Sequence, residues 1–302
     1  MRRSQRGKEE VIMQSLDEIK RRIRSIQTTS KITGAMKLVA TAKMKKLMNQ
    51  FKKINVFCQD FYHIIETLVE SEPLDSKNEP KRNLWILISS SLGLCGAFNI
   101  NICKHLMAQV QPNDKIIVVG RKGYAYLKSH GLAEHIIEYV DFSDNALDYL
   151  EVLPLCEEIV GYFNSHEFTH IHLVYTKFIN SLTFNPLHIQ LLPFDRSLFK
   201  MAEQNKRSHL DLDEQNKVIE YEPNKADILK SSLSIFITTS LYAAIYESRV
   251  CENGSRRNAM ETATDNAKEL IDELTLEFNE VRQQNITQEI NEIVAGADGS
   301  SI

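Results

Sequence analysis

Two short glycine-containing runs have residue types and a spacing that could bind phosphate. The run GLCGAFN at 93–99 follows an apolar stretch and opens a helical pattern, which is where loops that bind phosphate are found. Its glycines are spaced GxxG, as are Gly120 and Gly123, and the sequence contains neither GxGxxG nor GxxxxGK[ST]. A tight strand-to-helix turn is therefore favoured over a nucleotide site, and no cofactor is expected.

Histidines, serines and cysteines also fall short of a complete site. His170 and His172 alternate along a predicted strand, as two metal ligands could, but no third ligand accompanies them. The run ISSS at 88–91 lacks the GxSxG elbow of a hydrolase. The five cysteines are scattered and never form a CxxC pair, which argues against a zinc ribbon and favours a reducing compartment. The sequence predicts no catalytic residue and no metal site.

The middle of the chain has the alternating pattern that would position such residues. Short apolar runs predict strands, and each of the first three precedes a helical pattern, the clearest at 146–164. This alternation is typical of a Rossmann-like α/β layer with a mainly parallel sheet. The predicted strands are 84–90, 114–120, 136–141, 170–178 and 184–194.

The two ends of the chain are nearly free of helix breakers. All seven prolines lie between Pro73 and Pro223, and the flanking segments 14–72 and 224–295 each contain one glycine, Gly34 and Gly254. Two helices of roughly 85–100 Å are therefore expected. Apolar residues of the first alternate in steps of three and four, as in an interrupted coiled-coil seam. The second carries a stripe of small and apolar residues: Ala259, Ala263, Ala267, Leu270, Leu274, Phe278 and Val281.

Opposite charge predicts that these two helices pair with each other. Residues 14–53 carry a net charge of +9 and residues 247–302 a net charge of −7, in a chain whose total is −4. An antiparallel register in which paired residue numbers sum to about 293 brings basic and acidic residues together. It pairs Lys20 with Glu273, Arg21 with Asp272, Arg24 with Glu269, Lys31 with Glu261, Lys46 with Glu247, and Met36 with Arg257.

The same register makes two further predictions. Residues 281–302 extend past the N-terminal helix, which is taken to begin near Met13. Gly34 and Gly254 fall near one level, where they provide either a close contact between helices or a compliant neck. The predicted domains are an N-terminal extension (1–13), a coiled-coil helix (14–78), the central α/β domain (79–222) and a C-terminal coiled-coil helix with its tip (223–302). No apolar run is long enough to insert in a membrane, the most apolar short stretch being LWILI at 84–88.

Several blocks, in order along most of the chain, resemble the gamma subunit of the rotary F-type ATP synthase. The blocks are IRSIQTTSKITGAMKLVATAKM at 23–44, GLCGAFN at 93–99, RRNAMETATDNAKELI at 256–271 and RQQNITQEINEIVAGA at 282–297. The sequence departs from the family at three places. Ser90-Ser91-Leu92-Gly93 replaces the usual SDRG and loses its pair of charges, Gly34 replaces a lysine, and Ala297-Asp298-Gly299 ends the signature where a larger residue is usual.

The resemblance implies a non-catalytic central shaft. The coiled coil would fill the centre of the hexamer of alpha and beta subunits, its C-terminal end would turn in an apolar sleeve, and the central domain would lie near the epsilon subunit and the membrane ring of c subunits. ATP chemistry would take place on the beta subunits. Met36 and Arg257 match residues at the neck of the shaft; Arg282, Gln283 and Thr287 match the stretch that contacts the beta subunits, and Glu289 belongs to the same signature.

The implied location is peripheral, on the inner (cytoplasmic) face of an energy-transducing membrane, with a bacterial cell membrane favoured. Two other functions remain open from the residues alone. One is a nucleotide-dependent Rossmann-like enzyme with coiled-coil arms. The other is a basic coiled coil that binds nucleic acid, a partner that the acidic C-terminal helix makes less favoured.

Overall fold

The computed structural model describes residues 2–69, 81–142, 147–193, 222 and 224–298. The chain divides into two compact units, one made of Met1–Val39 with Arg257–Ile302 and the other of Ala40–Arg256. Two long helices, α1 (Arg2–Val69) and α6 (Lys225–Asp298), contribute to both units. The expected class, an α/β domain with long terminal helices, is confirmed. The domain limits predicted from sequence stay predictions, since two of them fall at or beside residues outside the described ranges.

The unit of residues 40–256 is built on a five-stranded sheet in the order β3-β2-β1-β4-β5. All five predicted strands are confirmed. β1 pairs in parallel with β2 and β4, β2 pairs in parallel with β3, and β4 and β5 form an antiparallel pair. β1 lies at the centre, which explains why its last five residues are all buried. The strands are β1 (Asn83–Ile88), β2 (Lys115–Val119), β3 (Ile136–Val140), β4 (His170–Phe178) and β5 (Phe184–Leu192).

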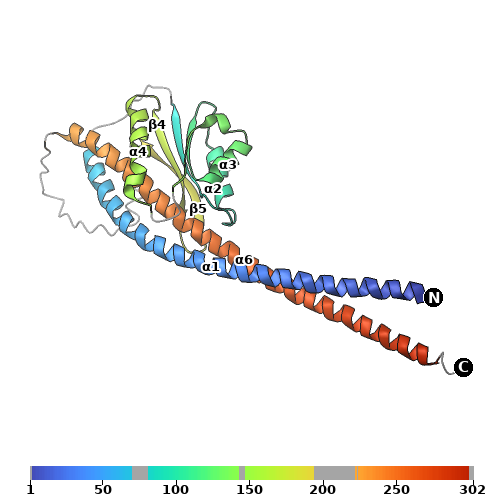
Figure 1. The fold of residues 1–302 in the computed structure, drawn as a ribbon. Helices are drawn as coiled ribbons and strands as arrows, with labels where there is room; N and C mark the ends of the chain where they lie inside the picture. The colour runs from blue at the N-terminus through green and yellow to red at the C-terminus, as the bar shows by residue number, and fades with distance from the viewer. Residues whose placement is uncertain (1, 70–80, 143–146, 194–221, 223, 299–302) are drawn as a thin grey trace. The chain divides into compact units, whose positions relative to one another are not determined.

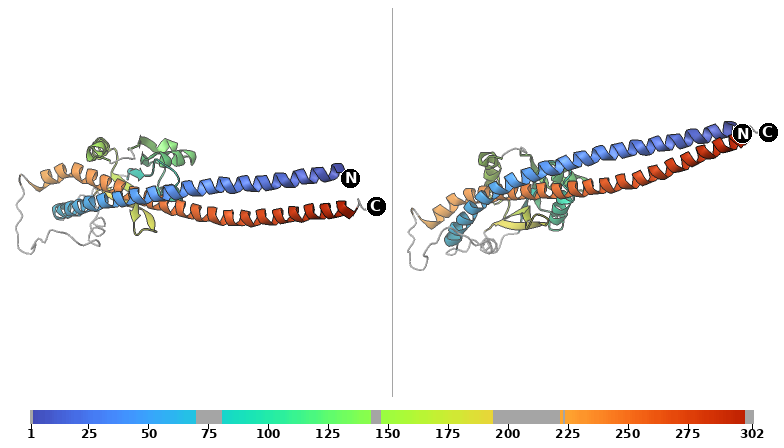
Figure 2. Two further views of the ribbon diagram at one scale, coloured as in Figure 1. Left: turned by 60° about the horizontal axis from the view of Figure 1, so that its bottom comes forward. Right: turned by 90° about the horizontal axis from the view of Figure 1, so that it is seen from below.

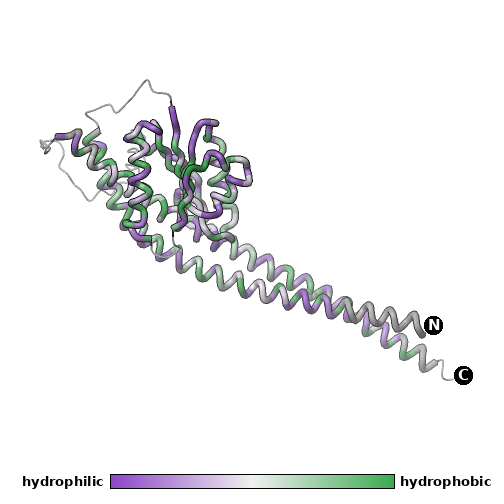
Figure 3. Tube along the Cα trace, turned by 45° about the horizontal axis from the view of Figure 1, so that its top comes forward, coloured by the Kyte–Doolittle hydropathy of each residue, from purple (hydrophilic) through white to green (hydrophobic). Residues whose placement is uncertain are grey.

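Helices cover both faces of this sheet (Figure 1). Because successive side chains of a strand point to opposite faces, β1 supplies both cores. Trp85 and Leu87 pack with α2 (Phe98–Met107) and α3 (Arg121–Ser129). Ile86 and Ile88 pack with α4 (Tyr149–Asn164) and with the parts of α1 and α6 that belong to this unit. The central strands β1 and β2 are buried at nearly every residue, as in a sheet covered on both faces. Figure 3 shows hydrophobic segments in the middle of this unit.

The inward face of α1 follows one unbroken pattern. Buried and half-buried positions recur in alternating steps of three and four residues, which is the period of a coiled-coil seam. The sequence suggested an interrupted seam that continued from Thr33 through Met36 and Val39 or Ala40. The structure instead fills it with the partly buried polar residues Ser30, Thr33 and Lys37, and Val39 is exposed. The positions are Leu16, Ile19, Ile23, Ile26, Ser30, Thr33, Lys37, Ala40, Met44, Leu47, Phe51, Ile54, Cys58, Phe61, Ile65 and Leu68.

The seam of α6 in the unit of residues 1–39 and 257–302 differs from the predicted stripe. Leu270, which we placed on the seam, is 47% exposed, and Ile271 takes its place. The predicted stripe took two successive steps of four residues, from Ala259 to Ala267, and then a step of three to Leu270; a strict alternation of three and four leads from Ala267 to Ile271 instead. The observed seam again alternates steps of three and four: Met260, Thr264, Ala267, Ile271, Leu274, Phe278, Val281, Asn285 and Gln288.

Two contacts fix the register of the helices in this unit, where α1 and α6 run side by side (Figure 2). The hydroxyls of Thr33 and Thr264 lie 2.7 Å apart, and Lys37 Nζ lies 2.8 Å from Glu261 Oε1. Residue numbers therefore sum to 297 or 298, so the predicted register of 293 is wrong by just over one helical turn. Glu261 pairs with Lys37, whereas we expected Lys31.

The corrected register also removes the predicted overhang. Helix α1 begins at Arg2 and not near Met13. With numbers that sum to 297 or 298, Arg2 lies level with about residue 295, so α1 runs beside nearly all of the segment that we expected to stand alone. In the other unit, the predicted pair of Lys46 and Glu247 is absent: Lys46 is exposed, while Glu247 is buried and accepts a hydrogen bond from the Phe178 N–H.

The two helix glycines have different surroundings, so they do not serve one shared contact. A Cβ added at Gly34 would meet no atom within 4 Å. A Cβ added at Gly254 would lie 2.4 Å from Cζ of Phe184, the first residue of β5. Gly254 thus lets α6 approach the sheet closely, and the close helix–helix contact that we considered at Gly34 is not formed.

This contrast predicts opposite effects of the same substitution. Gly34→Ala is expected to raise the free energy of unfolding by up to about 1 kcal/mol, because alanine favours the helix and meets open space. Gly254→Ala is expected to lower it, because the Phe184 ring must move. Urea unfolding followed by circular dichroism measures both changes. Equal effects of the two variants, or no recovery of stability when Gly254→Ala is combined with Phe184→Leu, would contradict the assignment.

Candidate partner-binding surface

The C-terminal part of α6 presents the residues that the sequence placed at a partner contact. Arg282, Gln283, Thr287 and Glu289 are all exposed. They remain at the surface because Val281, Asn285 and Gln288 take the seam positions. The structure therefore places these four side chains on outward faces of one helix, where another protein could reach them.

An apolar stripe accompanies these polar residues. Four apolar side chains, at 286, at 290 and then three and four residues further on, are exposed to solvent, although such residues are usually covered in isolated soluble proteins. An exposed stripe of this kind suits a contact with an apolar surface of another protein. The exposed fractions are 44% for Ile286, 54% for Ile290, 72% for Ile293 and 55% for Val294.

Met36 and Arg257, the residues expected at the neck, lie at different levels of the same unit. Met36 is half-buried on α1, and the register places it opposite residues 261–262 of α6. The offset from Arg257 is four to five residues, roughly 7 Å along the axis. Arg257 is also half-buried, and its Nη2 lies 2.9 Å from Asn258 Oδ1. The two residues are therefore offset by about one turn, within the two turns that the prediction of level residues allows.

The loop after β1, where a phosphate could have bound, is occupied by the chain itself. The N–H of Phe98, at the start of α2, donates to Cys95 O, and the N–H of Ser90 donates to Asn99 Oδ1. At the start of α3, the N–H of Lys122 donates to Ser90 O. A nucleotide loop offers such N–H groups to phosphate. Here they bond to protein atoms, which favours the tight-turn interpretation of GLCGAFN.

The second GxxG, Gly120 to Gly123, is also explained by close packing of the backbone. Gly120 has φ of +100°, and a Cβ there would lie 2.3 Å from the carbonyl oxygen of Ser89. A Cβ at Gly123 would lie 2.4 Å from the Ser89 hydroxyl, which accepts a hydrogen bond from the Gly123 N–H. The two glycines therefore allow α3 to begin against the end of β1.

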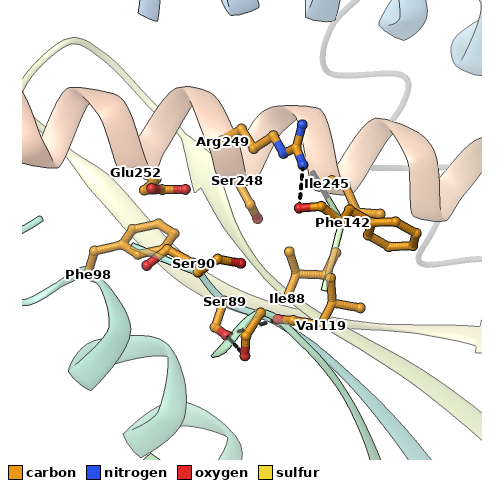
Figure 4. Close-up of a pocket in the computed structure, with 12 residues that line it drawn as sticks. Ile88, Ser89, Ser90, Phe98, Val119, Phe142, Ile245, Ser248, Arg249 and Glu252 are labelled. Carbon is orange, nitrogen blue, oxygen red and sulfur yellow. Dashed lines mark hydrogen bonds between the residues drawn. The ribbon is translucent and has the colours of Figure 1, made fainter. Parts of the chain in front are cut away.

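A pocket of about 410 Å³, part of it open to solvent, lies between the ends of β1 and β2 and helix α6. Its polar lining groups already have protein partners (Figure 4). The Ser89 hydroxyl donates to Val119 O, and Arg249 Nη2 lies 3.5 Å from Phe142 O. Ser248 Oγ accepts from the Thr176 N–H. Because these groups are hydrogen-bonded within the protein, the pocket lacks the set of polar groups converging on one point that would orient a ligand.

Arg256 is the residue that sequence reasoning missed. Its side chain is buried, its Nη2 lies 2.5 Å from Glu252 Oε1, and its Nε and Nη2 both donate to Gly93 O. The neighbouring Ser255 hydroxyl donates to Cys95 O at 2.7 Å. Helix α6 thus fixes the loop between β1 and α2. The i, i+4 spacing of Glu252 and Arg256 was visible in the sequence, but we chose the adjacent Arg257.

The loop after β1 is linked to a charged pair that other elements supply. The Ser91 hydroxyl donates to the carboxylate of Asp141, which follows β3. Arg121, the first residue of α3, lies 3.3 Å from the other oxygen of that carboxylate. The ends of three parallel strands are therefore linked by Ser91, Asp141 and Arg121.

Glu247 is a buried carboxyl group in the interface of α6 with β4. Its Oε1 accepts the Phe178 N–H at 3.0 Å. Burial raises the pKa of Glu247 to about 7, although the hydrogen bond and nearby Lys177 oppose the rise. Such a group changes its charge close to neutral pH and makes the stability of this interface sensitive to pH.

Metal binding at His170 and His172 gains no support from the geometry. Their rings are stacked with centroids 6.3 Å apart, and His172 instead stacks on Trp85. Burial, and then the neighbouring histidines, lower the pKa of His172 to about 4. In the described part of the chain, no three or more His, Cys, Asp or Glu side chains converge as metal ligands. None of the described helices has the length and hydropathy of a membrane span.

Comparison with known proteins gives consistent matches over nearly the whole chain. A family profile described as ATP synthase matches residues 15–299. The ATP synthase gamma chain of Malacoplasma penetrans (strain HF-2) is 40% identical over 292 residues, covering 95% of this chain and 100% of the relative. That of Mycoplasma genitalium is 37% identical over 286 residues, covering 94% and 99%.

Solved structures with the same fold come from mitochondrial ATP synthases. The Tetrahymena thermophila structure of the central stalk and c-ring has a chain with a TM-score of 0.60 and 24% identity, covering 77% of this chain and 99% of its own length. A chain of the Euglena gracilis structure of OSCP, F1 and c-ring has a TM-score of 0.66 and 17% identity, covering 94% of both chains. At these identities the likeness is one of fold.

Replacing Arg256 is expected to lower the stability of the folded protein strongly. Arg256→Met removes the guanidinium that pairs with the buried carboxylate of Glu252, which should lower the free energy of unfolding by about 3–5 kcal/mol. Lys268→Met is the matched control, because Lys268 and Asp265 form an exposed pair on the same helix that should contribute less than about 1 kcal/mol. Denaturant unfolding of both variants measures the difference, and similar losses would contradict the role of the buried network.

Glu247 is expected to make the protein less stable as pH rises. Its folded pKa of about 7 is above its ordinary value of 4.5, so the stability contributed by its bound proton is full below pH 4.5 and lost as pH rises through 7. Glu247→Gln should therefore remove about 3 kcal/mol of pH dependence. Urea midpoints of both proteins at several pH values between 5 and 8 test this, since all other titrating groups are shared. Parallel profiles would show that Glu247 does not titrate there.

Proposed function

Because the chain belongs to the ATP synthase gamma-chain family, we propose that it is the central rotor shaft of an F-type ATP synthase. In this role it transmits torque between the proton-driven membrane ring and the catalytic alpha/beta hexamer. The observation that carries the proposal is the match to gamma chains over 95% of this chain and the full length of the relative. The match includes both long helices as well as the α/β domain.

The helices have the mechanical properties that this role requires. α1 and α6 contain 68 and 74 residues, so each is roughly 100–110 Å long. Each has a buried seam, and in the unit of residues 1–39 and 257–302 the threonine pair and the Lys37–Glu261 ion pair lock them against sliding. A pair of locked helices resists twist better than a single helix, which is the property a shaft needs.

The chain itself is proposed to catalyse no reaction, and ATP is made or hydrolysed on the beta subunits. This proposal is supported at the strand ends of the α/β domain. The N–H groups that could hold a nucleotide phosphate there donate their hydrogen bonds to protein atoms. The exposed residues Arg282, Gln283, Thr287 and Glu289 are the proposed contact with the beta subunits. Met36 and Arg257 are the proposed contacts at the neck.

The central domain is proposed to bind the epsilon subunit and the ring of c subunits. The solved structures with this fold are described as central stalk, F1 and c-ring assemblies of ATP synthases. The proposed location is peripheral, on the inner face of a bacterial cell membrane, as the Malacoplasma and Mycoplasma relatives suggest. Affinity capture of the tagged chain from its own cells tests the assembly: recovery of alpha, beta and epsilon subunits supports it, and their absence contradicts it. Salt-sensitive binding of the purified chain to duplex DNA would instead favour a nucleic-acid-binding coiled coil.

The exposed residues of the tip give a test of the beta-subunit contact. Gln283→Ala with Thr287→Ala is expected to lower ATP turnover or its coupling to proton pumping in the assembled complex, while the thermal stability of the isolated chain stays unchanged. The matched control is Gln109→Ala with Thr183→Ala, since both residues are exposed on the α/β domain. Turnover and pumping of the tip variant equal to those of the control would show that the tip residues do not contact the catalytic subunits.

A further inference from the structure

Four histidines gather on the face of the sheet that α2 covers. His170 and His172 lie on β4, His188 on β5 and His105 on α2. His172 stacks on Trp85 with ring centroids 4.3 Å apart, and His188 lies edge-on to the same tryptophan at 5.7 Å. The proposed shaft function uses none of these residues.

His105 and His188 have a geometry that the other two histidines lack. Nε2 of His105 lies 3.1 Å from Nδ1 of His188, although the residues are far apart in sequence. Two imidazole nitrogens bound to one tetrahedral zinc ion at 2.0–2.1 Å are separated by about 3.3 Å. The two nitrogens therefore already lie within a few tenths of an ångström of the separation that a shared metal ion requires.

Both rings are held by well-packed elements. α2 is anchored next to His105 by the buried side chains of Cys103 and Leu106. His188 is paired with Val174 of β4 in the sheet, and Trp85 lies against its ring. Preorganised ligands lose little conformational freedom on binding, so two side chains can bind a metal ion measurably.

The rings also have suitable chemistry and access. A neutral imidazole ring is the form that binds a metal ion. His188 is exposed and His105 half-buried, so an ion can arrive from solvent and keep water ligands. Without metal, one of the two facing nitrogens carries a hydrogen and donates a hydrogen bond to the other. With metal, the donor ring changes tautomer, so that each neutral ring carries its hydrogen on the nitrogen remote from the ion.

We propose that His105 and His188 bind one divalent transition-metal ion of the zinc type, which clips α2 to the edge strand β5. Water completes the coordination, because the described residues contain no cluster of three or more His, Cys, Asp and Glu ligands. Imidazole suits Zn²⁺, Cu²⁺ and Ni²⁺, whereas Mg²⁺ prefers oxygen ligands and is not bound. Since β5 is the last strand of the sheet in the described part of the chain, the clip holds this edge strand to α2.

The test is a Zn²⁺ titration of the full chain in competition with a chromophoric chelator. One ion per chain is expected, together with a rise in melting temperature that Mg²⁺ does not produce. His188→Gln and, separately, His105→Gln should each weaken binding by at least about tenfold, because loss of even a residue that supports a ligand costs about 10–100-fold. His130→Gln is the matched control: His130 is exposed and lies at the end of α3, away from the pair.

Each outcome of the titration decides for or against the histidine pair. Far-UV circular dichroism without metal establishes that the variants fold, and either single variant suffices if the other does not. Binding that survives both substitutions, an equal loss in His130→Gln, or no Zn²⁺ binding by the parent would overturn the proposal. Because the titration uses the isolated chain and requires no partner subunit, its result is independent of the proposed rotor function.

Discussion

Alternation of buried positions in steps of three and four residues, along α1 and along residues 260–288 of α6, is the constraint on which the rest of the structure depends. A helix with this period keeps one face inward over its whole length only if a partner covers it, and the period predicts left-handed supercoiling. In α1 the pattern continues without a break from Leu16 to Leu68. The same helix can therefore serve a helix pair in one unit and a sheet-covering layer in the other.

The polar positions within this pattern determine register more than stability. Thr33 bonds to Thr264, and Lys37 extends from the seam to pair with Glu261. Apolar contacts alone tolerate sliding by one turn, since a step of three or four residues again places apolar groups opposite one another. A polar contact is lost on sliding. In the α/β unit, Arg256 has a comparable role because it joins α6 to the loop after β1.

Much of the fold could be predicted from the sequence, because its signals are local. The five strands are short apolar runs bounded by turns, and the two helices are the segments without proline. The register was missed because basic residues are spread over α1 and acidic residues over α6, so charge pairing is nearly as good one turn away. The predicted overhang of residues 281–302 is wrong because α1 begins at Arg2, well before the first block that resembles the gamma-subunit family. Arg256 was missed because its importance comes from the loop that packs over it, and sequence spacing does not reveal such packing.

The measurement that tests the account most directly is rotation of a marker on this chain within the assembled complex. All five cysteines are buried, so a single cysteine introduced at the exposed Lys128 on α3 can carry the marker selectively. With the alpha and beta subunits held on a surface, a rotor shaft turns its marker continuously and in one direction when ATP is supplied, and the marker stops when ATP is exhausted. A marker that stays still while the same complexes hydrolyse ATP would contradict the rotor function.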